Sequence, residues 1–328
     1  MMSLRAGLLG VGMMGRHHAR VLREVDGVEL VAIADPGGDP HGVAGDLPVL
    51  PDIDALIDAG IDIAVVAVPT RFHEDAAIKL AAAGVHALIE KPIAHSVEAG
   101  QRMVDAFAAA GLVGAVGHIE RFNPALQELR RRIQDGDLGE VYQIATRRQG
   151  PFPSRIADVG VGKDLASHDI DLTAWVAQSE YVGISAQTTF RSGREHEDMI
   201  AATGRLANGV IVNHLVNWLS PMKERVTIVT GEKGAFVADT ATGDLTFYAN
   251  GTVPVVWESI SAFRGVSEGD VTRFAIAKRE PLRVEHEAFR DAVLGRPSHV
   301  VTMEQGLRTL AVIEAALESA RMAEPLAL

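Results

Sequence analysis

Short apolar runs alternate with amphipathic stretches over the first 118 residues, which predicts strands and helices in turn. The strands are expected at Ala6–Gly10, Glu29–Asp35, Ile63–Pro69, His86–Glu90 and Val113–Gly117. The helices are expected at Met14–Glu24, Ile53–Ala59, Glu74–Ala83 and Ser96–Ala110. Unbroken apolar runs such as Ile63–Val68 suit strands that are buried on both faces. The pattern therefore predicts an α/β domain with a parallel, doubly wound sheet, in residues 1–120.

The pattern changes after about residue 120, where short strands follow one another with turn signals between them. Strands are expected at Glu140–Arg148, Val182–Arg191, Asp198–Leu206, Val210–Trp218, Arg225–Thr230, Ala235–Asp239, Leu245–Tyr248 and Val253–Ser259. Helices are expected at Pro124–Gln134, Lys163–Ala177, Leu282–Leu294 and Met303–Ala323. Asn208-Gly209 and Asn250-Gly251 favour two-residue hairpins. We therefore predict a second, α+β domain in residues 121–328 with a large, mostly antiparallel open sheet, and a last helix (303–323) that can pack back on the first domain.

Composition narrows the class of protein. The chain has 31 Lys and Arg against 43 Asp and Glu, a formal net charge of −12, which argues against nucleic-acid binding because that requires a basic surface. It has no cysteine, which excludes disulfides and thiolate metal sites and fits a reducing cytoplasm. No apolar run reaches about 18 residues and no secretory signal precedes the first strand, so we expect a cytoplasmic protein without membrane spans.

The most specific local motif is G-V-G-M-M-G at residues 10–15, a G-x-G-x-x-G turn between a predicted strand and a predicted helix. Gly10 allows the tight turn, Gly12 lets the backbone approach a pyrophosphate, and Gly15 lets the helix pack on the strand. The helix N-terminus offers N–H groups and a positive dipole end to phosphates. With Met13 and Met14 between these glycines, the turn is expected to bind a dinucleotide in a Rossmann domain.

Asp35 stands at the end of the next strand, 20 residues after Gly15. A carboxylate there accepts hydrogen bonds from the ribose hydroxyls of NAD and repels the 2′-phosphate of NADP. The following Pro36–Gly42 contains no Lys or Arg that would bind that phosphate. These features favour NAD, and the alternative is that Asp35 only caps the turn.

Two histidines, His17 and His18, follow Gly15 on the first helix. A histidine pair suggests a metal site, but adjacent residues on a helix face different directions. We therefore expect both to line the helix surface near the phosphates, and we predict no metal site in the chain.

Further candidates follow two later strands, at the sheet edge where open α/β sheets bind ligands. They are Pro69, Thr70, His73, Glu90 and Lys91, all expected to contact the cofactor. Lys91 directly follows a buried strand and precedes a proline, which would hold it on a rigid element. The alternative for Lys91 is a solvated surface lysine, the usual fate of this residue type.

Together, the glycine turn, Glu90-Lys91-Pro92, Arg121-Phe122-Asn123-Pro124 and the sheet-rich second half resemble the glucose–fructose oxidoreductase/inositol dehydrogenase/MocA family, essentially end to end. The resemblance implies an enzyme that transfers a hydride between a ring hydroxyl carbon of a sugar or cyclitol and a nicotinamide cofactor. It also implies that Lys91 lies between nicotinamide and substrate, and that the chain forms a homodimer or homotetramer.

A second signature of the family, D-x-x-x-H-x-x-D-L, is matched at residues 164–172. On a helix, Asp164, His168 and Asp171 lie at i, i+4 and i+7, on one face. Asp164 can then orient His168, which takes the hydroxyl proton, while Lys91 stabilises negative charge on the same oxygen. The alternatives are a helix cap at Asp164, a core histidine, or a carboxylate–histidine metal site. We expect Asp171 to be structural.

Arginines precede this helix in an otherwise acidic chain, and guanidinium groups suit phosphate oxygens. Residues 117–124, 147–161 and 164–171 resemble UDP-N-acetylglucosamine 3-dehydrogenases, with Gly162-Lys163 as a departure. This resemblance implies a nucleotide-sugar substrate, and the candidate contacts are Arg121, Arg147, Arg148 and Arg155. The alternatives are ion-paired or solvated arginines in a dehydrogenase of free cyclitols or sugars, and a non-catalytic nucleotide sensor.

Overall fold

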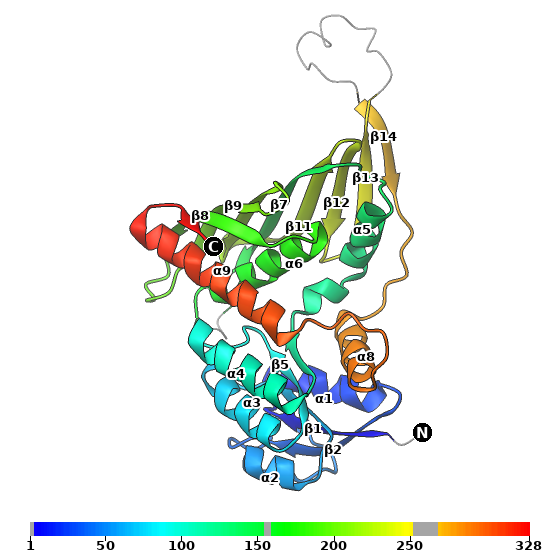
Figure 1. Cartoon of the computed structure of the whole chain (residues 1–328), viewed down its shortest axis with the longest axis vertical. Coiled ribbons are helices and arrows are strands. Elements are labelled where there is room, and N and C mark those ends of the chain that lie inside the picture. Colours follow the sequence, from blue (N-terminus) through cyan, green and yellow to red (C-terminus); the bar gives the residue numbers. More distant parts are fainter. Residues whose placement is uncertain (1–2, 154–158, 252–267) are drawn as a thin grey trace, which may run out of the picture. The chain divides into compact units, whose positions relative to one another are not determined.

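The computed structural model describes residues 3–153, 159–251 and 268–328, and it divides into two units (Figure 1). Unit 1 comprises Met1–Ile119 and Glu280–Ala311, and unit 2 comprises Glu120–Arg279 and Val312–Leu328. The sequence pattern assigns residues 121–328 to the second domain, with helix 303–323 able to pack back on the first. Instead, helix α8 (Pro281–Val293) and the first residues of helix α9 (Met303–Met322) belong to unit 1.

Unit 1 is built on a six-stranded sheet in the order β3-β2-β1-β4-β5-β6, in which all neighbouring strands are parallel. Its strands are β1 (Leu4–Leu9), β2 (Val28–Ala34), β3 (Val49–Leu50), β4 (Ile63–Val66), β5 (His86–Glu90) and β6 (Gly114–Gly117). Its other helices are α1 (Gly15–Glu24), α2 (Ile53–Asp58), the 3₁₀ turn η1 (Thr70–Phe72), α3 (His73–Ala82) and α4 (Val97–Ala110). The predicted doubly wound sheet is confirmed, and only β3 is too short to show a pattern in the sequence.

Both faces of the unit 1 sheet are covered, which explains its unbroken apolar strands. On one face Ala64 and Val66 of β4 pack in a cluster with apolar residues of α2, α3 and α4. On the other face Ile63 and Val65 pack with residues of α1 and with Phe289 of α8. The strand order reverses between β1 and β4, so the ends of these strands form the edge at which such sheets bind ligands.

Unit 2 contains a nine-stranded sheet in the order β14-β13-β12-β11-β7-β10-β9-β8-β15. Its strands are β7 (Val141–Pro151), β8 (Tyr181–Thr189), β9 (Met199–Leu206), β10 (Ile211–Asn217), β11 (Leu219–Gly231), β12 (Gly234–Asp239), β13 (Asp244–Asn250), β14 (Glu268–Arg273) and β15 (Leu326–Ala327). Only β7 and β10 pair in parallel. This confirms the predicted mostly antiparallel sheet.

Helices lie over one face of this sheet, as Figure 1 shows for α5 (Pro124–Gln134), α6 (Ser167–Ala177) and α9. Apolar residues of these helices form one core with Ile144, Val212 and Phe236 of the strands. The opposite face carries the other residues of each strand, including Arg147 and Val226, and no helix packs on it within the described part of unit 2. We call this the uncovered face.

Two local predictions meet different outcomes. Asn208-Gly209 does lie in the hairpin that joins β9 to β10, but the loop has three residues, 207–209, and not two. The Leu206 N–H donates to the Val210 oxygen, the Gly209 N–H donates to the Leu206 oxygen, and Gly209 has a φ of +91°. Asn250-Gly251 is not a two-residue hairpin, because β13 ends at Asn250 and its partner β14 begins only at Glu268. The predicted strand Val253–Ser259 falls outside the described residues.

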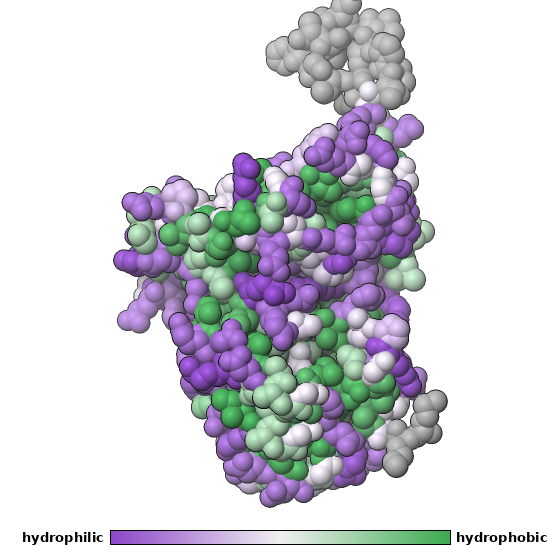
Figure 2. Space-filling view, viewed as in Figure 1, coloured by the Kyte–Doolittle hydropathy of each residue, from purple (hydrophilic) through white to green (hydrophobic). Residues whose placement is uncertain are grey.

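The structure can be compared with two further expectations, the absence of membrane spans and the absence of a metal site. No helix within residues 3–153, 159–251 and 268–328 is long and apolar enough to cross a bilayer. On the face that Figure 2 shows, hydrophobic patches are interrupted by hydrophilic residues. The same described residues contain no group of three or more side chains arranged to hold a metal ion.

Candidate active site

The glycine turn after β1 has the geometry that a dinucleotide needs. Gly10 has a φ of +94°, and a Cβ there would lie 2.7 Å from the Ala67 carbonyl oxygen. A Cβ at Gly15 would lie 2.0 Å from the Gly10 oxygen, so neither position tolerates a side chain. Nothing lies within 4 Å of a Cβ at Gly12, which leaves its backbone open to a ligand at the start of α1. These residues therefore fit the pyrophosphate of NAD, with Met13 beside them and 47% exposed.

Asp35 ties the end of β2 to this turn. Its Oδ2 accepts the Val11 N–H at 2.9 Å, and its Oδ1 accepts the Gly37 N–H at 2.8 Å. Asp35 therefore caps its own turn, as the alternative interpretation held. Because each carboxylate oxygen has a second acceptor position, the same side chain can still accept ribose hydroxyls. The two interpretations are compatible.

Lys91 follows β5 directly, and its bond to Pro92 is cis. Its side chain is partly buried, and its N–H donates to Glu90 Oε2 at 3.0 Å. The other oxygen, Glu90 Oε1, lies 2.9 Å from His18 Nε2. The Glu90 side chain thus accepts the Lys91 N–H and at the same time contacts His18 of helix α1.

His73, which the sequence suggests as a cofactor contact, is 1% exposed, and both of its ring nitrogens face backbone carbonyl oxygens. Its Nε2 lies 2.9 Å from the Val68 oxygen, and its Nδ1 lies 3.1 Å from the Pro92 oxygen. Burial lowers the pKa of His73, and a neutral ring has a single N–H that donates to one of these two carbonyl oxygens. It therefore connects the segment after β4 to the segment after β5, while exposed Pro69 and partly exposed Thr70 remain candidates for cofactor contact.

The expectation that both histidines of α1 line its surface is wrong for His18. His17 is exposed, whereas His18 is completely buried. The His18 ring has a partner at each nitrogen, Glu90 at Nε2 and His286 of α8 at Nδ1, the latter at 2.8 Å. His286 gave no signal in the sequence, because 268 residues separate the two histidines.

In unit 2, His168 lies in the first turn of α6 and is 9% exposed. Asp164 belongs to a preceding π-helical turn, η3 (Gly162–Ala166), and is 8% exposed. The predicted continuous α-helix therefore holds only from Ser167 onward, and the simple i, i+4 spacing does not describe Asp164 and His168.

The departure at Gly162-Lys163 has a local cause. Glu197 is buried against this segment and accepts the Gly162 N–H at 2.8 Å. A Cβ at Gly160 would lie 2.1 Å from the Glu197 carboxylate, so the segment requires glycine there. Lys163 forms an ion pair with Glu314 of α9 at 3.1 Å.

Asp171 holds Arg121 in a buried, two-pronged ion pair, with Arg121 Nε 2.7 Å from Oδ2 and Nη2 2.6 Å from Oδ1. Both side chains are at most 7% exposed. This supports the structural role expected for Asp171. It also engages the guanidinium of Arg121, which the sequence suggested as a substrate contact.

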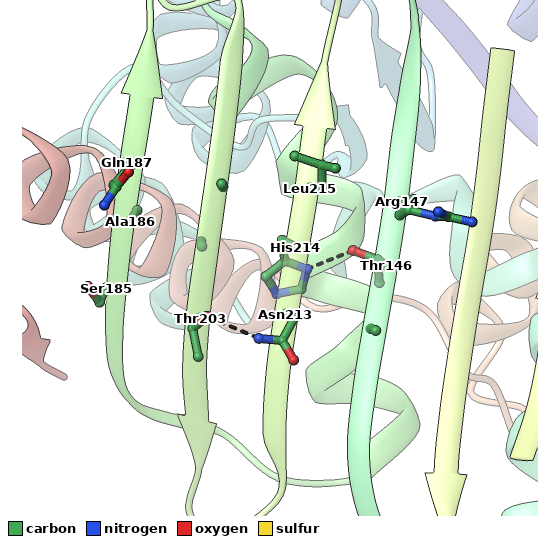
Figure 3. A pocket seen from close by; sticks show the side chains of 12 residues that line it. Thr146, Arg147, Ser185, Ala186, Gln187, Thr203, Asn213, His214 and Leu215 are labelled. Atoms are coloured by element: carbon green, nitrogen blue, oxygen red, sulfur yellow. Dashed lines mark hydrogen bonds between the residues drawn. The ribbon is translucent and has the colours of Figure 1, made fainter. Parts of the chain in front are cut away.

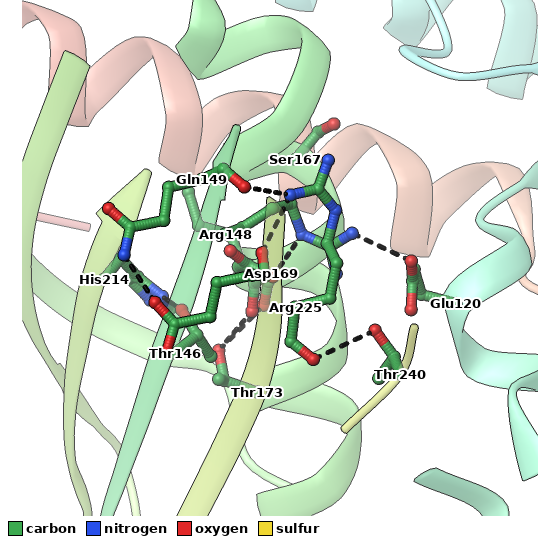
Figure 4. A network of polar contacts seen from close by, with 12 residues as sticks. Glu120, Thr146, Arg148, Gln149, Ser167, Asp169, Thr173, His214, Arg225 and Thr240 are labelled. Atoms are coloured by element: carbon green, nitrogen blue, oxygen red, sulfur yellow. Dashed lines mark hydrogen bonds and ion pairs between the residues drawn. The ribbon is translucent and has the colours of Figure 1, made fainter. Parts of the chain in front are cut away.

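Arg148 is likewise engaged by acids beneath the helices (Figure 4). Its Nε lies 2.8 Å from Asp169 Oδ1 and its Nη1 lies 2.8 Å from Glu120 Oε1, and the residue is 4% exposed. Burial raises the pKa of Asp169 even though Arg148 favours its charged form. These contacts favour the ion-paired interpretation of Arg148 over a contact with substrate phosphate.

Arg147, the next residue along β7, lies on the uncovered face and pairs with Glu224 at 2.7 Å. It borders a cavity of about 450 Å³ on that face, with Gln187, Thr203 and Asn213 among the lining residues (Figure 3). Because alternate strand residues face opposite sides, Arg147 points away from α6 and His168. Arg155, the fourth candidate, lies outside the described residues.

Comparison with known proteins identifies the family. Residues 4–118 match the oxidoreductase family with an NAD-binding Rossmann fold, and residues 126–237 match the C-terminal domain of the same glucose–fructose oxidoreductase/inositol dehydrogenase/MocA family. The chain is 31% identical over 325 residues to a UDP-N-acetylglucosamine 3-dehydrogenase of Acidithiobacillus ferrooxidans, covering 97% of this chain and 96% of that relative.

A solved structure of UDP-N-acetylglucosamine 3-dehydrogenase from the same organism superimposes with a TM-score of 0.87 at 27% identity, covering 98% of this chain and 99% of that one. A scyllo-inositol 2-dehydrogenase (NAD(+)) of Bacillus subtilis is 31% identical over 192 residues, which is 56% of each chain. The chain therefore belongs to the glucose–fructose oxidoreductase/inositol dehydrogenase/MocA family, as an NAD-binding oxidoreductase of the kind that acts on sugars and cyclitols.

Proposed function

We propose that this protein is an NAD-dependent dehydrogenase of a nucleotide sugar, of the UDP-N-acetylglucosamine class, that oxidises the hydroxyl at C3. The observation that carries this proposal is the similarity to a UDP-N-acetylglucosamine 3-dehydrogenase along 97% of the chain. The open glycine turn and the carboxylate of Asp35 support NAD as the cofactor.

The chemistry divides between named side chains. NAD, when bound, supplies the nicotinamide that accepts a hydride from the ring carbon. We assign His168 as the base that takes the hydroxyl proton, and Asp164 as the residue that orients it. Lys91 donates a hydrogen bond to the substrate oxygen and stabilises the negative charge that develops there. Glu90 holds the backbone of Lys91 through its N–H.

The arginines support a diphosphate-containing substrate less than the sequence suggested. Arg121 and Arg148 are engaged in buried ion pairs, and Arg147 pairs with Glu224 on the uncovered face. The phosphate contact that we retain as a proposal is Arg155.

A second candidate is a dehydrogenase of free inositols or monosaccharides. The observation that favours it is the 31% identity to a scyllo-inositol 2-dehydrogenase, which equals the identity to the nucleotide-sugar enzyme over a shorter stretch. The arginines of residues 121, 147 and 148, already paired with acids, are also consistent with a substrate that lacks a diphosphate.

A thermal-shift panel in the presence of NADH tests the two candidates against each other. Ligands that bind only the folded state raise its melting temperature by mass action. We expect a rise with UDP-N-acetylglucosamine and none with myo-inositol, glucose or free N-acetylglucosamine. A rise with inositol or free sugars alone would move the assignment to the second candidate.

A further inference from the structure

Unit 1 contains a buried polar cluster next to Lys91, and the proposed chemistry uses only one of its members, Glu90. Glu90, at the end of β5, is linked to His18 of α1, and His18 is linked to His286 of α8. Both contacts are short, at 2.9 and 2.8 Å, and the two histidine residues are 0% and 3% exposed. Three elements that are distant in sequence therefore meet through side chains at the residue that precedes Lys91.

A second glutamate, Glu285, lies beside His286 on α8 and is 2% exposed. Within the described residues, neither of its carboxyl oxygens has a hydrogen-bond partner. Burial and the negative charge of Glu90 raise its pKa well above the ordinary value. Burial therefore favours the neutral form of Glu285, since a charged carboxylate in this position would be strongly destabilising.

The pKa of Glu90 is shifted in the opposite direction. Burial alone would raise its pKa, but the hydrogen bond and charge of His18, together with Lys91, lower it below the ordinary value. Two buried glutamates in one region thus have pKa values shifted in opposite directions, and only Glu90 has hydrogen-bond partners at its carboxylate.

The hydrogen bonds of the cluster follow from the lowered pKa of Glu90. An ionised carboxylate only accepts, so His18 Nε2–H donates to Glu90. One further hydrogen lies between His18 Nδ1 and His286 Nε2: His18 carries it when that ring is charged, and His286 carries it when His18 is neutral. Burial and the charge of His18 lower the pKa of His286, which keeps that ring neutral. His286 therefore fixes the plane of the His18 ring while Glu90 receives its N–H.

We propose that His18 and His286 are positioning residues that hold the side chain of Glu90 and, through its contact with the Lys91 N–H, fix Lys91 at the end of β5. Because His18 sits on the helix that the glycine turn opens, the same contacts connect the pyrophosphate-binding element to the lysine. This role presupposes the proposed function of Lys91, so its test includes a measurement that requires no turnover.

The test uses four variants of the full chain. Glu90→Gln removes the charge at constant shape, and His18→Leu removes the donor. His18→Gln keeps an amide N–H that can still reach Glu90. Glu285→Gln is the matched control, because it makes the same change at a neighbouring buried glutamate whose carboxyl oxygens have no hydrogen-bond partner among the described residues. Thermal melting establishes that each variant is folded, and His18→Gln decides the question if His18→Leu does not fold.

The first readout is the rate at which Lys91 is reductively methylated without cofactor, followed by peptide mass mapping. The second is kcat and KM with NAD and UDP-N-acetylglucosamine. We expect Glu90→Gln and His18→Leu to label Lys91 severalfold faster than the native chain and to lower kcat by about tenfold or more, the effect of one lost charged hydrogen bond. The labelling rate and kcat of His18→Gln should lie between those of the two damaged variants and those of the native chain. Both values for Glu285→Gln should match those of the native chain.

Unchanged labelling and kcat in Glu90→Gln and His18→Leu would overturn the positioning role. It would also be overturned if Glu285→Gln were as damaging as Glu90→Gln, since the cluster would then act through packing alone. If the native chain turned over no sugar, the proposed function would fail while the labelling rates still decided the role of His18.

Discussion

At the scale of single residues, strand alternation assigns different roles to two neighbouring arginines. Arg148 lies under the helices between Asp169 and Glu120, and Arg147 lies on the uncovered face beside Glu224. From the sequence we expect both to contact phosphate, because the sequence does not show which of two adjacent strand residues faces the core. Only the pairing of β7 with its neighbours reveals which one is buried.

Replacing these arginines one at a time should separate the two roles. We expect Arg148→Ala to lower the free energy of unfolding by about 3–5 kcal/mol, because it leaves the buried carboxylate of Asp169 and the partly buried carboxylate of Glu120 without their cation. Arg147→Ala, whose side chain is 53% exposed, should cost less than about 1 kcal/mol. Urea denaturation of both variants measures this. Equal losses would contradict the assignment of Arg148 as the buried member.

Asp35 carries a second prediction at this scale. Asp35→Ala should narrow the preference for NAD over NADP, because the carboxylate that repels a 2′-phosphate is gone. The ratio of kcat/KM with the two cofactors measures the preference. Asp39→Ala is the matched control, since Asp39 is a nearby loop acid that accepts the Ala44 N–H at 2.7 Å. An unchanged ratio in Asp35→Ala, or an equal change in the control, would place the discrimination elsewhere.

At the scale of elements, the sequence predicts those helices, strands and turns that a local residue pattern specifies. The alternation of apolar runs locates five of the six strands of unit 1, and the glycine turn is found where the pattern places it. The π-helical turn before His168 was not predicted, because it depends on Glu197, which is distant in the sequence and lies against Gly160 and Gly162. The connection from β13 to β14 was mispredicted, because an Asn-Gly pair favours a turn without fixing which strand follows.

Helix α8 provides a prediction about stability and pH. Above about pH 4.5 the unfolded chain loses the proton of Glu285, while the folded chain retains it because burial raises that pKa. The folded state then binds more protons, so the contribution of Glu285 to stability falls as the pH rises, by at most about 1.4 kcal/mol per pH unit.

Glu285→Gln removes this titration. The difference in free energy of unfolding between Glu285→Gln and the native chain, measured in urea at several pH values from 5 upward, should grow with pH in favour of the variant. Parallel curves would show that Glu285 titrates normally in the folded chain.

At the scale of the whole molecule, long-range contacts decide features that no local pattern shows. Residues 280–311 belong to unit 1, although they follow β14, a strand of unit 2, in the sequence. The cluster of Glu90, His18 and His286 depends on that return of the chain. For the same reason the sequence located His18 on the correct helix but on the wrong side of it.

The uncovered face of unit 2 carries the prediction at this scale. Val226 and Leu215 lie on it beside polar residues such as Gln187 and Thr203, and a large sheet face of this kind is suited to a partner. We propose that a second copy of the chain covers it. Light scattering should give a mass of two or four chains of 35.0 kDa. A single species of one chain would contradict this.

The proposed oxidation of a nucleotide sugar by NAD, with His168 as the base, can be measured directly. The native chain and His168→Ala are mixed with NAD and UDP-N-acetylglucosamine, and NADH and the product mass are followed. We expect NADH and a sugar lighter by two hydrogens with the native chain. We also expect turnover lower by about 10²–10⁴ in His168→Ala, with NAD affinity nearly unchanged. Oxidation of myo-inositol but not of the nucleotide sugar, or equal turnover by the two chains, would contradict this proposal.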